Sequence, residues 1–216
     1  MDTRFLQPLD EYFSANYSDY VRLSALEGYV MPEIVYVAPD GNIARRDPEC
    51  MRLCHQKDSE ALLKALKAEL TDTNFTFNFA FIPVAERIRD RFRKYTFAKI
   101  LPSVLAKYNE TVESAGAKLA IEPRFWRKIA KGKLYPEKCT VLALALVCNL
   151  QHRDLTSLLN VCGMTMEKDN VRDVVVTYLV EQRITNLEMR ERCLAEYRVT
   201  NLPIRGGDVA SEGELA

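Results

Sequence analysis

The stretch from Thr111 to Leu150 limits the fold more than any other part of the chain, because its helix signals are strong and closely spaced. Three helices are predicted, over residues 112–119, 122–132 and 137–148. Pro123 suits a first helical position and Gly132 suits a C-terminal cap, so the second helix has a clear start and end. A tight turn at Ala120-Ile121 separates the first two helices. Helix, tight turn and helix in this order predict a helix-turn-helix.

The second predicted helix carries a row of basic side chains. They recur at i, i+3, i+4 and i+7, which places them on one helical face. They are Arg124, Arg127, Lys128 and Lys131, and Lys133 follows just beyond. In one interpretation the two arginines reach base edges or phosphates in a major groove, while the three lysines neutralise phosphates. In the other, this face is solvated and pairs with the acidic N-terminal region.

The opposite face of this helix is apolar. Phe125, Trp126 and Ile129 are expected to point back into the domain. Stacking of Trp126 on a nucleobase is an alternative. The helical offset of Trp126 from Ile129 favours a position in the core.

The stretch resembles the Cro/CI-type (XRE-like) helix-turn-helix, and the resemblance covers about residues 97–198, close to half the chain. Its matching segments are 111–120, Ile121, 126–132, Pro136 and 140–150, with the phrases LYPEK, ALALVCNL, LLNVCG and VRDVVVTYL. The likeness is greatest to an extended helical version found as an appendage in bacterial multidomain proteins, some linked to phage defence. The resemblance implies a helical DNA-binding fold and a place in such a system.

The chain departs from the family pattern around the turn. Many DNA-reading members have a polar residue at the position of Val112 and a small or polar one at that of Pro123. The turn residue, often glycine, is Ala120, and Glu122 adds a negative charge at the start of the recognition helix. These departures bear on the reading of specific bases and not on the fold.

The charge of the chain is unevenly distributed. The 216 residues have a formal net charge of +0, so the whole chain is not a polycation. Residues 1–85 carry 8 Lys or Arg and 13 Asp or Glu, a net charge of −5. Residues 86–138 carry 14 and 6, a net charge of +8, and residues 139–216 carry 8 and 11, a net charge of −3. A basic patch around the helix-turn-helix is typical of phosphate binding, although a solvated helix face gives the same count.

The first 95 residues predict a small α or α+β region. A β-branched run at 33–38 and the turn residues at 39–42 predict a hairpin, and helices are predicted to start at Asp47-Pro48 and Asp58-Ser59. Alternating phenylalanines at 75–81 predict a strand with an aromatic face, which is interpreted as packing rather than base stacking because no basic residue interleaves it. A helix is expected to open at Pro83, with an apolar stripe formed by Val84, Ile88, Phe92 and Tyr95.

The rest of the chain predicts a helical domain over residues 96–199. Its first helix is expected over 97–108, with a kink or restart at Pro102. The apolar helices from Val141 to Leu179 are expected to form one core with the helix-turn-helix. A tail over 200–216 is expected to be disordered. The predicted fold class is therefore mainly α, a Cro/CI-like helical domain after an α or α+β N-terminal region.

Catalytic and metal-binding motifs are poorly represented. The sequence has 2 histidines and lacks a Gly-rich phosphate loop, G-x-S-x-G and H-E-x-x-H. Cys50, Cys54 and His55 are the only metal-like cluster, and ordinary packing is favoured because a second ligand pair does not follow. We expect no enzyme activity, cofactor or metal. The N-terminus lacks a signal-peptide pattern and no apolar run approaches membrane length, so we expect a reducing cytoplasm.

These patterns together predict a non-enzymatic nucleic-acid-binding protein of helix-turn-helix type, with duplex DNA favoured over RNA. The residues expected to bind are Arg124, Arg127, Lys128, Lys131 and Lys133. A regulatory role, or one in a bacterial defence or mobile-element system, comes from the resemblance alone. The alternative is a protein-interaction adaptor in which the helix-turn-helix is a scaffold and the acidic N-terminal region docks a partner. The oligomeric state stays open.

Overall fold

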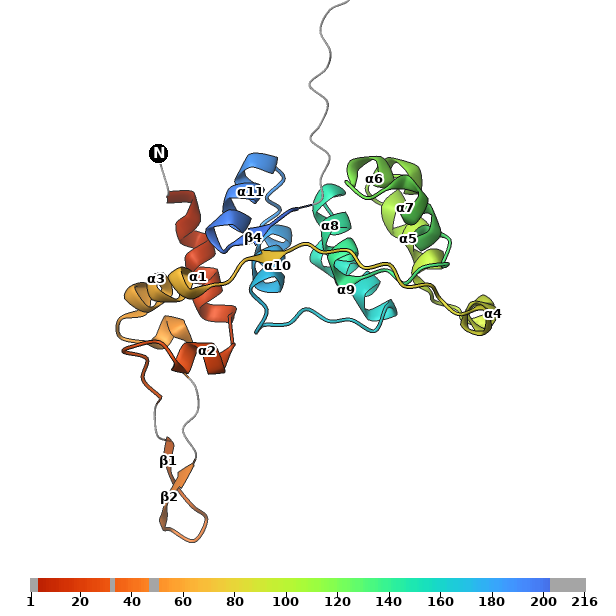
Figure 1. Ribbon diagram of the computed structural model, residues 1–216. Helices are drawn as coiled ribbons and strands as arrows, with labels where there is room; N and C mark the ends of the chain where they lie inside the picture. The colour runs from red at the N-terminus through yellow and green to blue at the C-terminus, as the bar shows by residue number, and fades with distance from the viewer. Residues whose placement is uncertain (1–3, 32–33, 47–50, 203–216) are drawn as a thin grey trace, which may run out of the picture. The chain divides into compact units, whose positions relative to one another are not determined.

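The computed structural model describes residues 4–31, 34–46 and 51–202, and these residues are mainly α-helical, as the sequence predicts (Figure 1). The α-helices are α1 (Gln7–Asn16), α2 (Tyr20–Ser24), α3 (Ser59–Glu69), α4 (Val84–Phe92), α5 (Phe97–Ala106), α6 (Val112–Lys118), α7 (Pro123–Ala130), α8 (Lys138–Val147), α9 (His152–Val161), α10 (Val171–Glu181) and α11 (Leu187–Glu196). The 3-10 helices are η1 (Arg4–Leu6) and η2 (Leu53–His55). The strands are β1 (Ile34–Val37), β2 (Ile43–Arg46), β3 (Thr73–Asn74) and β4 (Val199–Thr200). No helix in the described ranges has the length and apolar character that a membrane crossing requires.

The chain divides into two compact units built from non-contiguous segments. Unit 1 consists of Met1–Thr73, Met166–Tyr178 and Leu187–Thr200, and unit 2 consists of Asn74–Thr165, Leu179–Asn186 and Asn201–Ala216. The sequence instead predicts two contiguous regions with one boundary between residues 95 and 96. Residues 74–95 belong with α6 and α7, while α11 and most of α10 belong with the N-terminal helices. The predicted tail at 200–216 lies almost wholly outside the described residues.

Aromatic packing explains why the late helices join unit 1. The Tyr197 ring lies 4.3 Å from that of Phe13 in α1, and the Tyr178 ring lies 5.3 Å from that of Tyr12. Tyr197 is fully buried, and its hydroxyl donates to Asp10 Oδ1 at 2.7 Å. Burial and the bond to Asp10 raise the pKa of Tyr197 well above its ordinary value.

One lysine joins three helices of unit 1. The Lys67 ammonium on α3 lies 2.7 Å from Asp10 on α1 and 2.7 Å from Glu196 on α11. It also lies 4.7 Å from the centre of the Tyr197 ring. Because the lysine side chain is mostly covered, these contacts resist screening more than a surface pair does.

The predicted hairpin and the helix after it are confirmed. Strands β1 and β2 pair antiparallel from Ile34 opposite Arg46 to Val37 opposite Ile43. The Asp40 carboxylate accepts a hydrogen bond from the main-chain N–H of Asn42 at 3.1 Å and so stabilises the turn. The helix α3 begins at Ser59, as predicted. The helix start predicted at Asp47-Pro48 falls on residues that the structure does not describe.

The core of unit 2 is helix α8. Every residue from Cys139 to Val147 is buried, which agrees with its apolar character on all sides. Helices α6 and α9 pack against α8, and α5 packs against α6, α7 and α9. The helix α5 is continuous through Pro102.

A buried carboxylate fixes α9 to the end of α5. Asp154 accepts hydrogen bonds from the Lys107 ammonium and the Tyr108 hydroxyl, each at 2.6 Å. Burial alone would raise the pKa of Asp154, but these two hydrogen bonds and the charge of Lys107 lower it. The helix α5, which packs against α6, is therefore fixed to α9.

The strand predicted at residues 75–81 is wrong. Residues 75–80 have no regular secondary structure, and Phe81 forms a single bridge with Leu134. The main chain of this segment is bonded to the loop between α7 and α8 instead of to a neighbouring strand. Ile82 N donates to Lys133 O at 3.0 Å, and Tyr135 N donates to Ala80 O at 2.9 Å.

Candidate nucleic-acid interface

The helices α6 and α7, predicted to form the helix-turn-helix, follow each other across a short turn and pack together. Thr111 caps α6, because its hydroxyl accepts from Ser114 N at 3.0 Å while the Ser114 hydroxyl accepts from Thr111 N at 2.8 Å. Pro123 starts α7 as predicted. The chain leaves α7 through Gly132, whose φ of +64° suits glycine at a helix C-terminus.

Trp126 locks α7 onto α6. Its side chain is only 3% exposed, and its indole Nε1 donates to Val112 O at 2.7 Å. The ring lies directly over Gly116, where an added Cβ would come within 3.0 Å of the indole Cγ and closer still to Cδ1 and Nε1. Trp126 is therefore a core residue, as its offset from Ile129 predicts, and its ring is not accessible to a nucleobase.

The predicted basic residues lie on the outer side of α7 and at the turn that follows it. They differ in exposure and in whether they form an ion pair. Arg127, Lys131 and Lys133 are exposed. Arg124 is exposed but pairs with the Glu122 carboxylate at 2.6 Å. Lys128 is half-buried against aromatic rings. An exposed ion pair of the Arg124 kind contributes about 0–1 kcal/mol, so a phosphate can replace the carboxylate at little cost.

Phe125 does not point into the domain as predicted. It is half-buried and stacks on Phe79, with ring centres 4.3 Å apart and an interplanar angle of 4°. Phe77 stacks loosely on Phe79 at 6.5 Å. Phe81, with 66% of its surface exposed, completes the group. We call Phe77, Phe79, Phe81 and Phe125 the aromatic strip.

The aromatic strip is bordered by cations from α7. The Arg124 guanidinium lies 4.8 Å from the centre of the Phe125 ring. The Lys128 ammonium lies 5.1 Å from the centre of Phe81 and 6.0 Å from that of Phe125. The sequence gives no sign of this arrangement, because the basic residues come from a helix more than 40 positions away from Phe77, Phe79 and Phe81.

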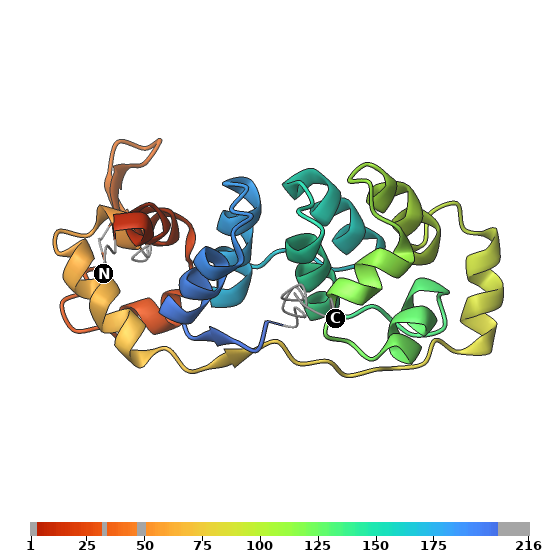
Figure 2. The same ribbon diagram turned by 90° about the horizontal axis from the view of Figure 1, so that it is seen from above.

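The helix α4 has its polar side against the rest of unit 2 and its apolar side in solvent. Glu86, Arg87 and Asp90 are half-buried, whereas Val84, Ile88 and Phe92 are 61%, 51% and 86% exposed. The predicted apolar stripe therefore exists on the helix but does not join the core. The helix stands at the edge of unit 2 (Figure 2).

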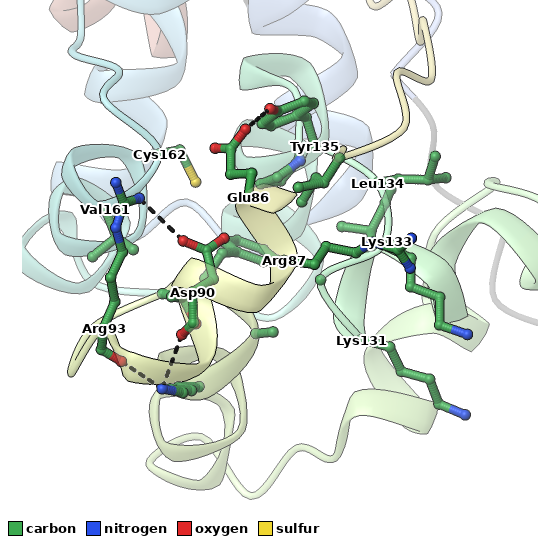
Figure 3. Close-up of a pocket in the computed structure, with 18 of the residues that line it drawn as sticks. Glu86, Arg87, Asp90, Arg93, Lys131, Lys133, Leu134, Tyr135, Val161 and Cys162 are labelled. Atoms are coloured by element: carbon green, nitrogen blue, oxygen red, sulfur yellow. Dashed lines mark hydrogen bonds and ion pairs between the residues drawn. The ribbon is translucent and has the colours of Figure 1, made fainter. Parts of the chain in front are cut away.

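Polar contacts hold α4 in this orientation. The Tyr135 hydroxyl donates to Glu86, while the Asp90–Arg93 pair at 3.1 Å is local to the end of the helix (Figure 3). The Lys99 ammonium donates to the main-chain oxygens of Asp90, at 3.2 Å, and of Arg91 and Arg93. A cation at the C-terminal end of a helix is also favourable for the helix dipole.

A cavity of about 760 Å³ lies between α4, the start of α5, the loop from Lys131 to Pro136 and the end of α9. Its floor is apolar and includes Ile82, Phe97 and Leu134. Lys131 and Lys133 border the cavity, but their side chains point away from α4 (Figure 3). The free cations thus face outward, on the side of α7, rather than into the cavity.

No family model, curated protein or solved structure matches the chain. The resemblance to Cro/CI-type domains stays a prediction.

Two observations on the described part of the chain concern metal ligands and thiols. Residues 4–31, 34–46 and 51–202 hold no group of three His, Cys, Asp or Glu side chains arranged around a metal ion. Cys50 of the metal-like cluster lies outside these ranges, and Cys54 is exposed. Burial raises the pKa of the Cys148 thiol to about 12 and that of Cys193 to about 11, so both stay protonated at neutral pH.

Proposed function

We propose that the protein binds nucleic acid, with duplex DNA favoured, through the outer face of α7. The observation that supports this most is the division of α7 into an anchored side and a free cationic side. Trp126 and Ile129 are buried in unit 2, whereas Arg124, Arg127 and Lys131 are exposed. A recognition helix needs the same division, because its inner side must be rigid while its outer side enters a groove.

The charges suggest how a duplex approaches. Glu122 at the start of α7 repels phosphate, and the aromatic strip borders Arg124 and Lys128. Arg127, Lys131 and Lys133 carry no ion pair in the described part of the chain. We therefore place phosphate contacts mainly at these three residues, with Arg127 in the middle of the exposed face.

The wider role that we propose follows from the Cro/CI resemblance. It is a non-enzymatic, cytoplasmic regulator, or a component of a bacterial defence or mobile-element system.

The test is a binding titration with a DNA duplex of roughly two helical turns. Fluorescence anisotropy measures the affinity at about 50 and 200 mM salt. Binding should weaken steeply with salt, because each neutralised phosphate releases counterions. The double variant Arg127→Glu/Lys131→Glu reverses two charges and removes two phosphate contacts. It should lower the affinity and reduce the slope of log K against log salt by about 2. Lys57→Glu/Lys64→Glu makes the same charge change on exposed residues of unit 1 and should have a much smaller effect.

Arg127→Ala separates a sequence reader from a non-specific binder. Loss of a bidentate base contact costs about 1–3 kcal/mol and relaxes specificity, while loss of a phosphate contact weakens all sequences alike. A wild type without salt-sensitive binding to duplex DNA, single-stranded DNA or RNA would end the nucleic-acid proposal.

A protein-interaction adaptor is the second candidate, and α4 favours it. Its exposed stripe of Val84, Ile88 and Phe92 is bordered by the exposed Arg89 and Arg91. Apolar patches with a charged border are typical of docking surfaces. The partner that fits is a protein with an apolar groove and an acidic rim. This surface differs from the acidic N-terminal region that the sequence suggests for an adaptor.

A further inference from the structure

We propose that the aromatic strip binds unpaired nucleobases, so that the protein takes single-stranded nucleic acid beside the cationic face of α7. This inference rests on the proposed nucleic-acid function and names a second ligand class for the same side of unit 2. Single-strand binders combine aromatic rings, on which bases stack, with cations that follow the phosphate backbone. The four rings of the strip and the basic residues of α7 supply both parts.

The exposure of the strip differs from that of an ordinary packed segment. Phe75 and Ile82, which flank it, are buried and act as anchors. Between them, Phe77 and Phe79 are half-buried and Phe81 is 66% exposed. An exposed phenylalanine forgoes the free energy of burial, about 1.5–3 kcal/mol for a complete side chain. A stacked base would recover part of it.

The cations are placed for a strand that stacks on these rings. Lys128 lies beside both Phe81 and Phe125, and Arg124 lies beside Phe125. Lys131 and Lys133 follow Lys128 along the chain and are exposed. A base on Phe81 therefore brings its phosphate near the Lys128 ammonium, while the next phosphates meet Lys131 or Lys133.

The strip is held in place before any ligand arrives. Main-chain bonds join Ile82 to Lys133 and Tyr135 to Ala80, and Asn78 N donates to Glu137 Oε2 at 2.8 Å. The closed Phe79–Phe125 stack fixes the segment to α7 itself. Little conformational entropy remains to be lost on binding, which favours affinity.

The strip and the apolar stripe of α4 differ in ligand chemistry. Phe79 and Phe125 lie in a near-parallel stack, and cations lie over Phe81 and Phe125. On α4, Val84 and Ile88 are aliphatic, and Phe92 is an exposed ring without a ring contact among the described residues. Stacked planar rings suit planar bases. Aliphatic side chains have no flat face for a base, and no cation lies over the Phe92 ring among the described residues, so the proposal is confined to the strip.

The experiment compares two fluorescent probes with the full-length chain. One is oligothymidine of about 15 nucleotides, a length within the usual site size of single-strand binders, and the other is an abasic strand with the same phosphates. Stacking contributes about 1–3 kcal/mol per base, so the oligothymidine should bind about 5-fold to 150-fold tighter at equal salt. Phe81→Leu should weaken oligothymidine binding about 5-fold or more and leave the abasic probe unchanged.

Phe92→Leu is the matched control, because it makes the same substitution on the exposed face of α4, outside the strip. Equal affinity for the two probes, or an unchanged oligothymidine affinity in Phe81→Leu, would overturn the inference. Salt-sensitive duplex binding together with equal probe affinities would remove only this inference. Failure of every probe to bind would remove the proposed function as well. Thermal unfolding of Phe81→Leu checks that the variant is folded, and a Phe79→Leu variant replaces it otherwise.

Discussion

The contact between Gly116 on α6 and Trp126 on α7 sets the geometry of the candidate interface. The indole lies over a helical position without a side chain and donates to Val112 O. Any side chain at residue 116 would push the tryptophan outward and tilt α7. The orientation of the cationic face therefore depends on a single missing Cβ.

We expect Gly116→Ala to destabilise the protein by about 1–3 kcal/mol, the usual cost of overpacking. The sign is informative, because alanine in place of glycine in an open helix is stabilising by about 1 kcal/mol. Urea unfolding measures the difference. Ala117→Ser, at the exposed neighbouring position, should stay within about 0.5 kcal/mol of the wild type. A more stable Gly116→Ala protein would mean that Trp126 is not seated on Gly116.

At the same scale, the sequence predicts Trp126 well and Phe125 badly. Both occur on the apolar side of a predicted helix, and periodicity treats them alike. Trp126 faces the core directly, while Phe125 lies at its edge and finds Phe79, which is 46 positions earlier in the chain. Sequence periodicity describes which face a residue occupies. It does not show which distant segment covers that face.

At the scale of elements, α4 is the exception to normal amphipathic packing. Its half-buried side is polar and is held by Tyr135 and Lys99. Its exposed side is apolar. Hydrogen bonds from Tyr135 and Lys99 attach the helix to the rest of unit 2, and its apolar face is exposed.

We expect Ile88→Ser/Phe92→Ser to change the free energy of unfolding by no more than about 0.5 kcal/mol, because both side chains are exposed. Leu101→Ala in α5 is the contrasting variant: its side chain is fully buried, and its loss should cost about 2–5 kcal/mol. Chemical denaturation measures both. A loss above about 2 kcal/mol in the serine variant would show that the stripe is buried in solution, which would weaken the case for a docking surface.

Local signals predict the elements with strong start and end residues. The helices α3, α6, α7 and α8 and the β1–β2 hairpin all occur where expected. The strand at 75–81 does not, because alternating phenylalanines are equally compatible with an extended segment that pairs with a loop. What decides between the two is the position of residues 133–135, which is a long-range property.

At the scale of the whole molecule, the chain leaves unit 1, forms most of unit 2 and returns to complete unit 1. The contiguous domains predicted at 1–95 and 96–199 do not describe this path. The late helices look from their sequence like a continuation of the bundle, but Tyr197 packs on Phe13 at the other end of the chain.

We therefore expect a fragment of residues 96–199 to unfold without cooperativity and to bind a dye specific for exposed apolar surface. It retains Cys193, Leu194 and Tyr197, which are buried in the full chain, but lacks the α1 and α3 residues that cover them. Circular dichroism in a urea titration, with the full chain as reference, measures this. A sharp single transition without dye binding would favour the contiguous domain instead.

The buried position of the only tryptophan has a spectroscopic consequence. Trp126 lies in unit 2, and unit 1 has tyrosines but no tryptophan. Selectively excited indole emission therefore reports on the α6–α7 joint alone, whereas far-ultraviolet dichroism averages over the helices of both units. Recorded on one sample, the two signals distinguish the melting of one half from the melting of the other, without a label or an introduced mutation.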